Sequence, residues 1–176
     1  DELAGVKQLR EILESGELTA DVLREAEKVE GSVRGVGIHA AGIIIAPLRP
    51  AVLLAKQAAT LDVLSQGRLD LGVGAGWQRE EYEAEGLDFD KRGQLLTDTI
   101  AACKVLWRDA PAAFESPSVS FRDVWCLPRP VQPGGPPLWF GVALGPGNLK
   151  RVAELGAGWM PMDSRPEALR TGIAKL

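Results

Sequence analysis

The chain has 176 residues, of which 45% are hydrophobic and 25% are charged, and its formal net charge is −4. This composition is typical of a globular domain and excludes an intrinsically disordered chain, and the acidic balance argues against nucleic acid as a partner. No apolar run approaches the ~20 residues that cross a bilayer, and no signal-peptide pattern opens the chain, so we expect a cytoplasmic protein with no membrane partner.

The first part of the chain predicts two short helices and a strand. Leu, Val and Ile recur at helical spacing in residues 2–13 and 20–29, with Ser15-Gly16 between the two segments. Residues 38–47 are rich in β-branched side chains and end at Pro47, which indicates a buried strand.

From residue 51 onward, helical and strand patterns alternate. We expect helices at 51–65, 80–107 (interrupted near Gly86), 148–155 and 166–175, strands at 69–74, 138–142 and 158–160, a hairpin within 112–127 around Ser116-Pro117-Ser118, and a connector at 128–137. This order predicts an α/β fold with a parallel sheet. Cys103 and Cys126 lack the spacing of a metal site, and we expect reduced thiols in or near the core.

Four motifs occur in a fixed order in the longer part of the chain. They are LAKQAATLDVLSQGRLDLGVGAGWQREEYEAEGLDFDKRG at 54–93, FRDVWCLPRPVQ at 121–132, PPLWFG at 136–141 and RVAELGAGWMP at 151–161. With them, residues 48–176 resemble the bacterial luciferase-like monooxygenases, flavin- or deazaflavin-dependent oxidoreductases built on a (β/α)8 barrel. Because such a barrel takes roughly 250 residues and we count about four β-α units, we expect a partial TIM barrel, a half barrel, preceded by an N-terminal helical segment.

The resemblance implies a site at the carboxyl ends of the strands. The coenzyme, flavin mononucleotide or a deazaflavin, would contact Gly74, Ala75, Gly76, Trp77, Ala143 and Gly145. A dinucleotide-binding G-x-G-x-x-G pattern fails because Trp77 stands at its third glycine. In the barrel, the glycines would let the backbone approach a flat ring, and Trp77 would either wall that ring or plug the barrel top.

Three further assignments follow from the same resemblance. Glu81 and Arg92 lie near the site, and we favour an ion pair or a helix cap over a direct role in chemistry. The segment 144–147 either meets the coenzyme phosphate with backbone amides or forms a simple helix-entry turn. No catalytic residue and no metal site is assigned, and we attribute Trp107, Trp125, Trp139 and Trp159 to core or hairpin packing.

The first 47 residues carry a different resemblance. The segment VEGSVRGVGIHAAGIIIAP at 29–47 resembles part of the bacterial DNA polymerase III alpha subunit, with Arg34 and His39 at its polar positions. No aspartate cluster for two-metal chemistry accompanies it, and we interpret His39 as scaffolding.

Three hypotheses therefore stand side by side. The chain is an oxidoreductase of the luciferase-like class, incomplete and inactive as this fragment and with an unknown small-molecule substrate; a remnant of a replicative polymerase; or a chimera or truncation without autonomous function. An open half barrel would expose two sheet edges, so we also expect a homodimer formed through those edges.

Overall fold

The computed structural model describes residues 43–176. The helices expected at 2–13 and 20–29, the start of the strand expected at 38–47, and Arg34 and His39 lie outside the described residues.

The described residues form a four-stranded parallel sheet. Its strands are β1 (Ile43–Ile45), β2 (Leu71–Gly74), β5 (Leu138–Gly141) and β6 (Gly158–Met160), in the order β1-β2-β5-β6. The register aligns Ile44 with Val73, Val73 with Phe140 and Phe140 with Trp159, so all four carboxyl ends lie at one edge of the sheet. The α/β class with a parallel sheet is confirmed.

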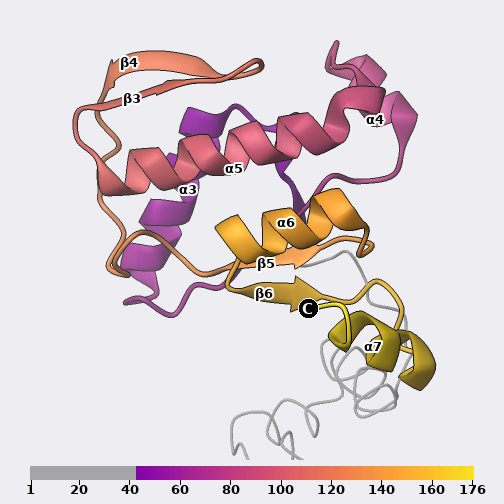
Figure 1. Cartoon of the computed structure of the whole chain (residues 1–176). Helices are drawn as coiled ribbons and strands as arrows, with labels where there is room; N and C mark the ends of the chain where they lie inside the picture. The colour runs from indigo at the N-terminus through magenta and orange to yellow at the C-terminus, as the bar shows by residue number, and fades with distance from the viewer. Residues whose placement is uncertain (1–42) are drawn as a thin grey trace, which may run out of the picture. The chain divides into compact units, whose positions relative to one another are not determined.

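Helices follow the strands and cover the sheet. They are α3 (Ala51–Leu64), α4 (Arg79–Ala84), α5 (Arg92–Arg108), α6 (Pro146–Leu155) and α7 (Pro166–Ile173), with short 3-10 turns η3 (Ala46–Leu48) and η4 (Phe89–Lys91). Figure 1 shows α5 and α6 on the same side of β5 and β6, with α3 packed against α5. The core between sheet and helices contains Val73, Phe140, Leu54 and Ile100, each at most 1% exposed. Burial of such side chains stabilises this layered arrangement by roughly 1.5 to 3 kcal/mol each.

Two expected boundaries shift for identifiable reasons, and an expected helix interruption is confirmed. The first strand ends at Ile45 because Pro47 enters the 3-10 turn η3. Helix α6 begins at Pro146 rather than at residue 148, since proline has no N–H to leave unpaired in the first turn of a helix. The long helical pattern divides after α4 at Gly86, whose φ of +68° is the left-handed conformation that ends helices.

The expected hairpin is also present. Strands β3 (Ala112–Glu115) and β4 (Ser120–Val124) pair antiparallel around the Ser116–Val119 turn. The buried carboxylate of Asp98 on α5 accepts hydrogen bonds from the Ser118 hydroxyl (2.6 Å) and the Gln94 amide (2.7 Å). Asp98 therefore fastens the hairpin turn to α5.

The connector at 128–137 has no regular structure but is anchored at two points. The Asp62 carboxylate on α3, fully buried, accepts hydrogen bonds from the Gln132 backbone N–H (3.0 Å) and side-chain amide (2.8 Å), and that amide also donates to the Leu69 carbonyl (2.7 Å). Further on, Gly135 lies directly on the indole of Trp107. The Trp107 indole N–H in turn donates to the Ala55 carbonyl (2.9 Å), so the connector is packed onto both α5 and α3.

Both cysteines are buried and free, as expected from the sequence. Burial, together with the neighbouring Cys126, raises the pKa of the Cys103 thiol to about 12, and burial also raises the pKa of Cys126, although Lys56 opposes that shift. Because the thiolate is the reactive form, both thiols should resist modification at neutral pH.

We therefore expect a disulfide-exchange reagent to label neither cysteine on the timescale on which it labels free cysteine. Unfolding in urea should release both thiols at once. The measurement is the absorbance of the released thiolate before and after urea addition. Rapid labelling of one thiol in the folded protein would show that its segment opens locally.

Within residues 43–176, none of the helices combines the length and apolar character needed to cross a bilayer.

Candidate functional site

One cavity of about 620 Å³ collects the ends of all four strands. Residues from β1 (Ile43, Ile45), the β2 end (Gly74–Trp77), the β5 end (Gly141–Ala143) and the segment after β6 (Met162) line it. The first two turns of α5 and α6 complete its wall with Arg92, Gly93, Leu96, Asn148 and Arg151. Ligand sites of parallel α/β folds lie at this edge, where strands end and helices begin.

The glycines of this cavity are packed by isoleucines. A Cβ on Gly74 would lie 3.0 Å from the Gly141 carbonyl oxygen and 3.1 Å from Ile43 Cγ2. A Cβ on Gly141 would lie 2.3 Å from Ile43 Cδ1, and one on Gly76, whose φ is +71°, would lie 3.1 Å from Ile45 Cδ1. Close packing against Ile43 and Ile45 therefore explains why these positions are glycine, whether or not a coenzyme ring binds here.

An aromatic cluster supports the loop after β2. The buried Tyr82 of α4 donates a hydrogen bond from its hydroxyl to the Ala75 carbonyl, and its ring meets Phe89 edge-on with centroids 5.4 Å apart. The guanidinium groups of Arg79 and Arg92 lie 4.6 and 4.0 Å from the Phe89 centroid. The cluster fixes both the loop backbone and the position of Arg92 beside the cavity.

A second network supports the loop after β5. Arg151 on α6 donates to the Gly93 carbonyl (2.8 Å) and the Thr97 hydroxyl (2.9 Å) of α5, and to the side-chain oxygen of Asn148. The Asn148 amide donates to the Ala143 carbonyl (2.7 Å). These hydrogen bonds connect the Ala143 carbonyl to α6 and, through Arg151, to α5.

The charged residues of the cavity favour an anion. Its charged lining residues are Asp90, Arg92 and Arg151, and the Asp90 carboxylate pairs with Arg79 (3.0 Å). Among the ion pairs of residues 43–176, neither Arg92 nor Arg151 has a carboxylate partner. Burial lowers the pKa of the Arg151 guanidinium, which still remains protonated near neutral pH.

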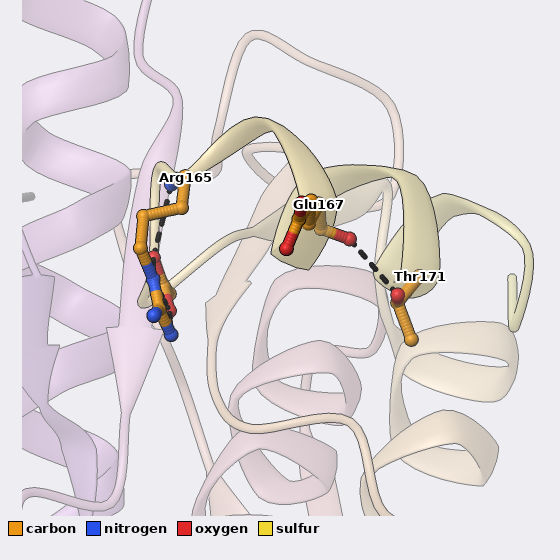
Figure 2. Close-up of polar contacts among 4 residues, drawn as sticks. Arg165, Glu167 and Thr171 are labelled. Carbon is orange, nitrogen blue, oxygen red and sulfur yellow. Dashed lines mark hydrogen bonds and ion pairs between the residues drawn. The ribbon is translucent and has the colours of Figure 1, made fainter.

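The polar residues that follow β6 line a separate groove with Trp159 and Leu144, and only Met162 of this segment reaches the strand-end cavity. Figure 2 shows Arg165 at the start of α7, where its guanidinium pairs with the Asp163 carboxylate (2.5 Å), and Thr171, whose hydroxyl donates to the Glu167 carbonyl (2.9 Å). The Arg165 guanidinium and its hydrogen bond hold the pKa of the Asp163 carboxyl below its ordinary value. These charges are compensated locally, unlike those of Arg92 and Arg151.

The predicted site residues divide into two groups. Gly74, Ala75, Gly76, Trp77, Ala143 and Arg92 all line the cavity, whereas Gly145 and Glu81 do not. Gly145 instead forms the turn that opens α6: its N–H donates to the Ala143 carbonyl, and its carbonyl accepts from Asn148 N–H, both at 3.0 Å. The strand end at Ala46-Pro47 also lies elsewhere, with Ala46 in the core and Pro47 on another groove.

The structure also places the aromatic and charged residues near the site. Trp77 is 81% exposed and stands at the rim of the cavity. Glu81 and Arg92 do not form an ion pair within the described part of the chain; Arg92 donates to the Phe89 carbonyl (3.0 Å) and Glu81 lies in the first turn of α4. Among the four tryptophans expected in core or hairpin packing, Trp107 is in the core and Trp159 packs against it, whereas Trp125 (56% exposed), directly after the hairpin strand β4, and Trp139 (38%) lie outside the core.

Sequence reasoning missed the residues that support the cavity walls. Tyr82, Asn148 and Arg151 were not singled out, nor was the placement of Ile43 across the glycines. A signal for one pair was present, since Asn148 and Arg151 have the i, i+3 spacing that puts two side chains on one face of a helix.

Solved structures of two oxidoreductases share the fold of this chain. A monooxygenase from Streptomyces bottropensis matches with a TM-score of 0.69 and 24% identity over 76% of this chain and 41% of its own. An F420-dependent secondary alcohol dehydrogenase matches with a TM-score of 0.61 and 24% identity over 71% of this chain and 38% of its own. At this identity the likeness shows the fold: the chain has the α/β fold of these oxidoreductases.

The family model for luciferase-like monooxygenases matches residues 39–176, which is most of the chain, and the chain belongs to that family. The match begins before Leu48 and includes all of β1, which the sequence analysis had placed on the polymerase-like side. The resemblance of residues 1–47 to a polymerase segment finds no support in these comparisons and stays a prediction.

Curated relatives include a flavin-dependent monooxygenase, and the match covers less than half of the length of the two relatives described here. An uncharacterised protein of Mycobacterium tuberculosis is 38% identical over 109 residues, which is 62% of this chain and 38% of the relative. The oxygenase component of a flavin-dependent trigonelline monooxygenase from Acinetobacter baylyi is 35% identical over 100 residues, covering 56% of this chain and 28% of the relative. The chain thus spans well under half the length of these relatives.

Proposed function

We propose that the strand-end cavity binds the phosphate-bearing ring coenzyme of a flavin- or deazaflavin-dependent oxidoreductase. The observation that carries the proposal is the convergence of four strand ends on one cavity with an aromatic rim and two arginines without carboxylate partners. Flavin is favoured over deazaflavin because the trigonelline monooxygenase, at 35% identity, is flavin-dependent by name, whereas the F420-dependent structure is 24% identical.

The cavity fits such a ligand in size and chemistry. A volume of about 620 Å³ lies within the range of roughly 300 to 1,000 Å³ typical of small-molecule sites. In the proposed arrangement Trp77 offers an aromatic face to the ring, and Arg92 and Arg151 attract the phosphate. When bound, the coenzyme would supply hydride or oxygen chemistry, while the protein residues bind and orient it.

We further propose that the four strands are part of a (β/α)8 barrel. The parallel order β1-β2-β5-β6, with helices between successive strands, is that of consecutive barrel units. In such a barrel, the loops after the other strands would hold the substrate, and the cavity described here would hold the coenzyme.

The test is a binding titration that separates the phosphate from the ring. We expect flavin mononucleotide to quench tryptophan fluorescence and to bind about tenfold more tightly than riboflavin, since a charge-assisted phosphate contact contributes about 1.4 kcal/mol. A parallel titration with the deazaflavin coenzyme decides between the two ring types.

A matched pair of variants locates the phosphate. Arg92 and Arg79 contact the same Phe89 ring, but only Arg92 lines the cavity. Arg92→Gln should remove the preference for flavin mononucleotide over riboflavin. Arg79→Gln, which leaves the cavity-lining Asp90 without its ion-pair partner, should only reduce that preference. Equal affinity of the wild-type protein for both ligands, or no binding of any of the three, would refute the proposed function.

A further inference from the structure

One side chain lies over part of the glycine backbone that lines the cavity. Gly74 on β2 and Gly141 on β5 are neighbours in the register, one position beyond the Val73–Phe140 pair, and both line the cavity. Neither has a side chain of its own. Whatever covers this two-strand floor therefore determines how closely a ligand approaches the sheet.

Ile43 covers that floor from the adjacent strand. Its Cγ2 lies 3.1 Å from the position of a Gly74 Cβ, and its Cδ1 lies 2.3 Å from the position of a Gly141 Cβ. The side chain thus extends from β1 across β2 to β5. Its terminal methyl group fills the place where β5 would otherwise present bare backbone.

The next residue gives an internal comparison. Ile44 points to the other face of β1, where it packs against the core and borders a separate groove. The two side chains are identical, lie on the same strand and are both partly buried, but only Ile43 lines the strand-end cavity.

We infer that Ile43 sets the depth of this cavity and so selects the width of the flat ring that the site accepts. The inference rests on the proposed function for the identity of the ligand, but the position of Ile43 is a property of the protein alone. With Ile43 in place, a ring meets a branched aliphatic side chain, and without it a wide ring can lie on the Gly74–Gly141 backbone, which has no Cβ to keep it away.

The first experiment tests the position without any ligand. Gly141→Ala should lower the melting temperature because its new methyl group displaces Ile43 Cδ1. In the Ile43→Val background, which lacks only that atom, the decrease should shrink to roughly half or less, as coupled neighbours behave in a double-mutant cycle. In the Ile44→Val background the decrease should stay at its wild-type value. Equal decreases in the two valine backgrounds would overturn the inference.

The second experiment tests ring selection. Flavin mononucleotide and nicotinamide mononucleotide both carry a phosphate-bearing tail but differ in ring width. We expect Ile43→Ala to raise the ratio of their affinities in favour of flavin mononucleotide by about tenfold, Ile43→Phe to abolish flavin mononucleotide binding, and Ile44→Ala to leave the ratio unchanged. Should Ile43→Ala fold poorly, Ile43→Val should show a smaller shift in the same direction.

The outcomes separate the two claims. If the wild-type protein binds flavin mononucleotide and the ratio does not respond to Ile43, the inference on depth is wrong and the proposed function stands. If the melting temperatures show the coupling and no variant binds either nucleotide, the proposed function is wrong, and the coupling supports Ile43 as the side chain that covers the Gly74–Gly141 floor.

Discussion

Replacing Gly135 with alanine is expected to destabilise the protein by about 2 to 5 kcal/mol. Two costs add at this position: φ is +99°, where an L-residue loses about 1 to 2 kcal/mol, and the new Cβ would lie 2.1 Å from the buried Trp107 ring, an overlap that costs about 1 to 3 kcal/mol. Trp107 cannot yield freely, because its indole N–H is bonded to Ala55. Urea unfolding followed by circular dichroism measures the loss.

The preceding glycine is the matched control. Gly134 has a similar φ of +80°, but a Cβ there would meet nothing within 4 Å. Gly134→Ala should therefore cost only the backbone term, about 1 to 2 kcal/mol. Equal losses for the two variants would mean that the connector at 128–137 does not rest on Trp107.

The Asp62→Asn substitution should have the second large effect, about 2 to 3 kcal/mol. Both carboxylate oxygens accept hydrogen bonds from Gln132, so an amide NH2 at either position would face an N–H donor in a buried site. Asp70→Asn is the control, since Asp70 is exposed and accepts only a 3.4 Å bond from Trp139. Comparable stability of Asp62→Asn and wild type in urea would contradict the anchoring role.

Asp62 also predicts how stability depends on pH. Burial raises the pKa of this carboxyl, but the hydrogen bonds from the Gln132 backbone and side chain, with those from Val131 and Leu69, outweigh it and hold the pKa below its ordinary value. A folded-state pKa below the unfolded value of about 3.9 means that the carboxylate stabilises the fold above that pH and loses this effect as the pH falls through the folded pKa. The wild-type advantage over Asp62→Asn should therefore shrink below about pH 4 in an acid titration of unfolding free energy.

The sequence was sufficient for the class of fold and for the edge of the sheet that carries the cavity. Hydrophobic periodicity indicated the strands and helices, and the carboxyl ends of parallel strands lie together. Of the residues that the family resemblance implied at those ends, Gly74–Trp77 and Ala143 line one cavity and Gly145 does not. Local signals such as Gly86 and the 116–119 turn were equally readable.

Contacts between distant segments were beyond such reasoning. Asp62 looked like one more polar residue of an amphipathic helix, because its partner Gln132 lies seventy positions away in an irregular connector. Arg151 on α6 donates a hydrogen bond to the Gly93 carbonyl on α5, and no local sequence pattern predicts that contact. The Ile43 side chain could be placed over Gly74 and Gly141 only once the strand register was known.

The two alanine carbonyls at the strand ends carry a consequence for binding kinetics. Ala75 is held by Tyr82 and Ala143 by Asn148, and each donor comes from the helix that follows its own strand. Loops fixed in this way are preorganised, so a ligand pays little entropy to order them on arrival. Association should then approach a simple second-order docking process with no slow conformational phase, and differences in affinity among related ligands should appear mainly in their dissociation rates.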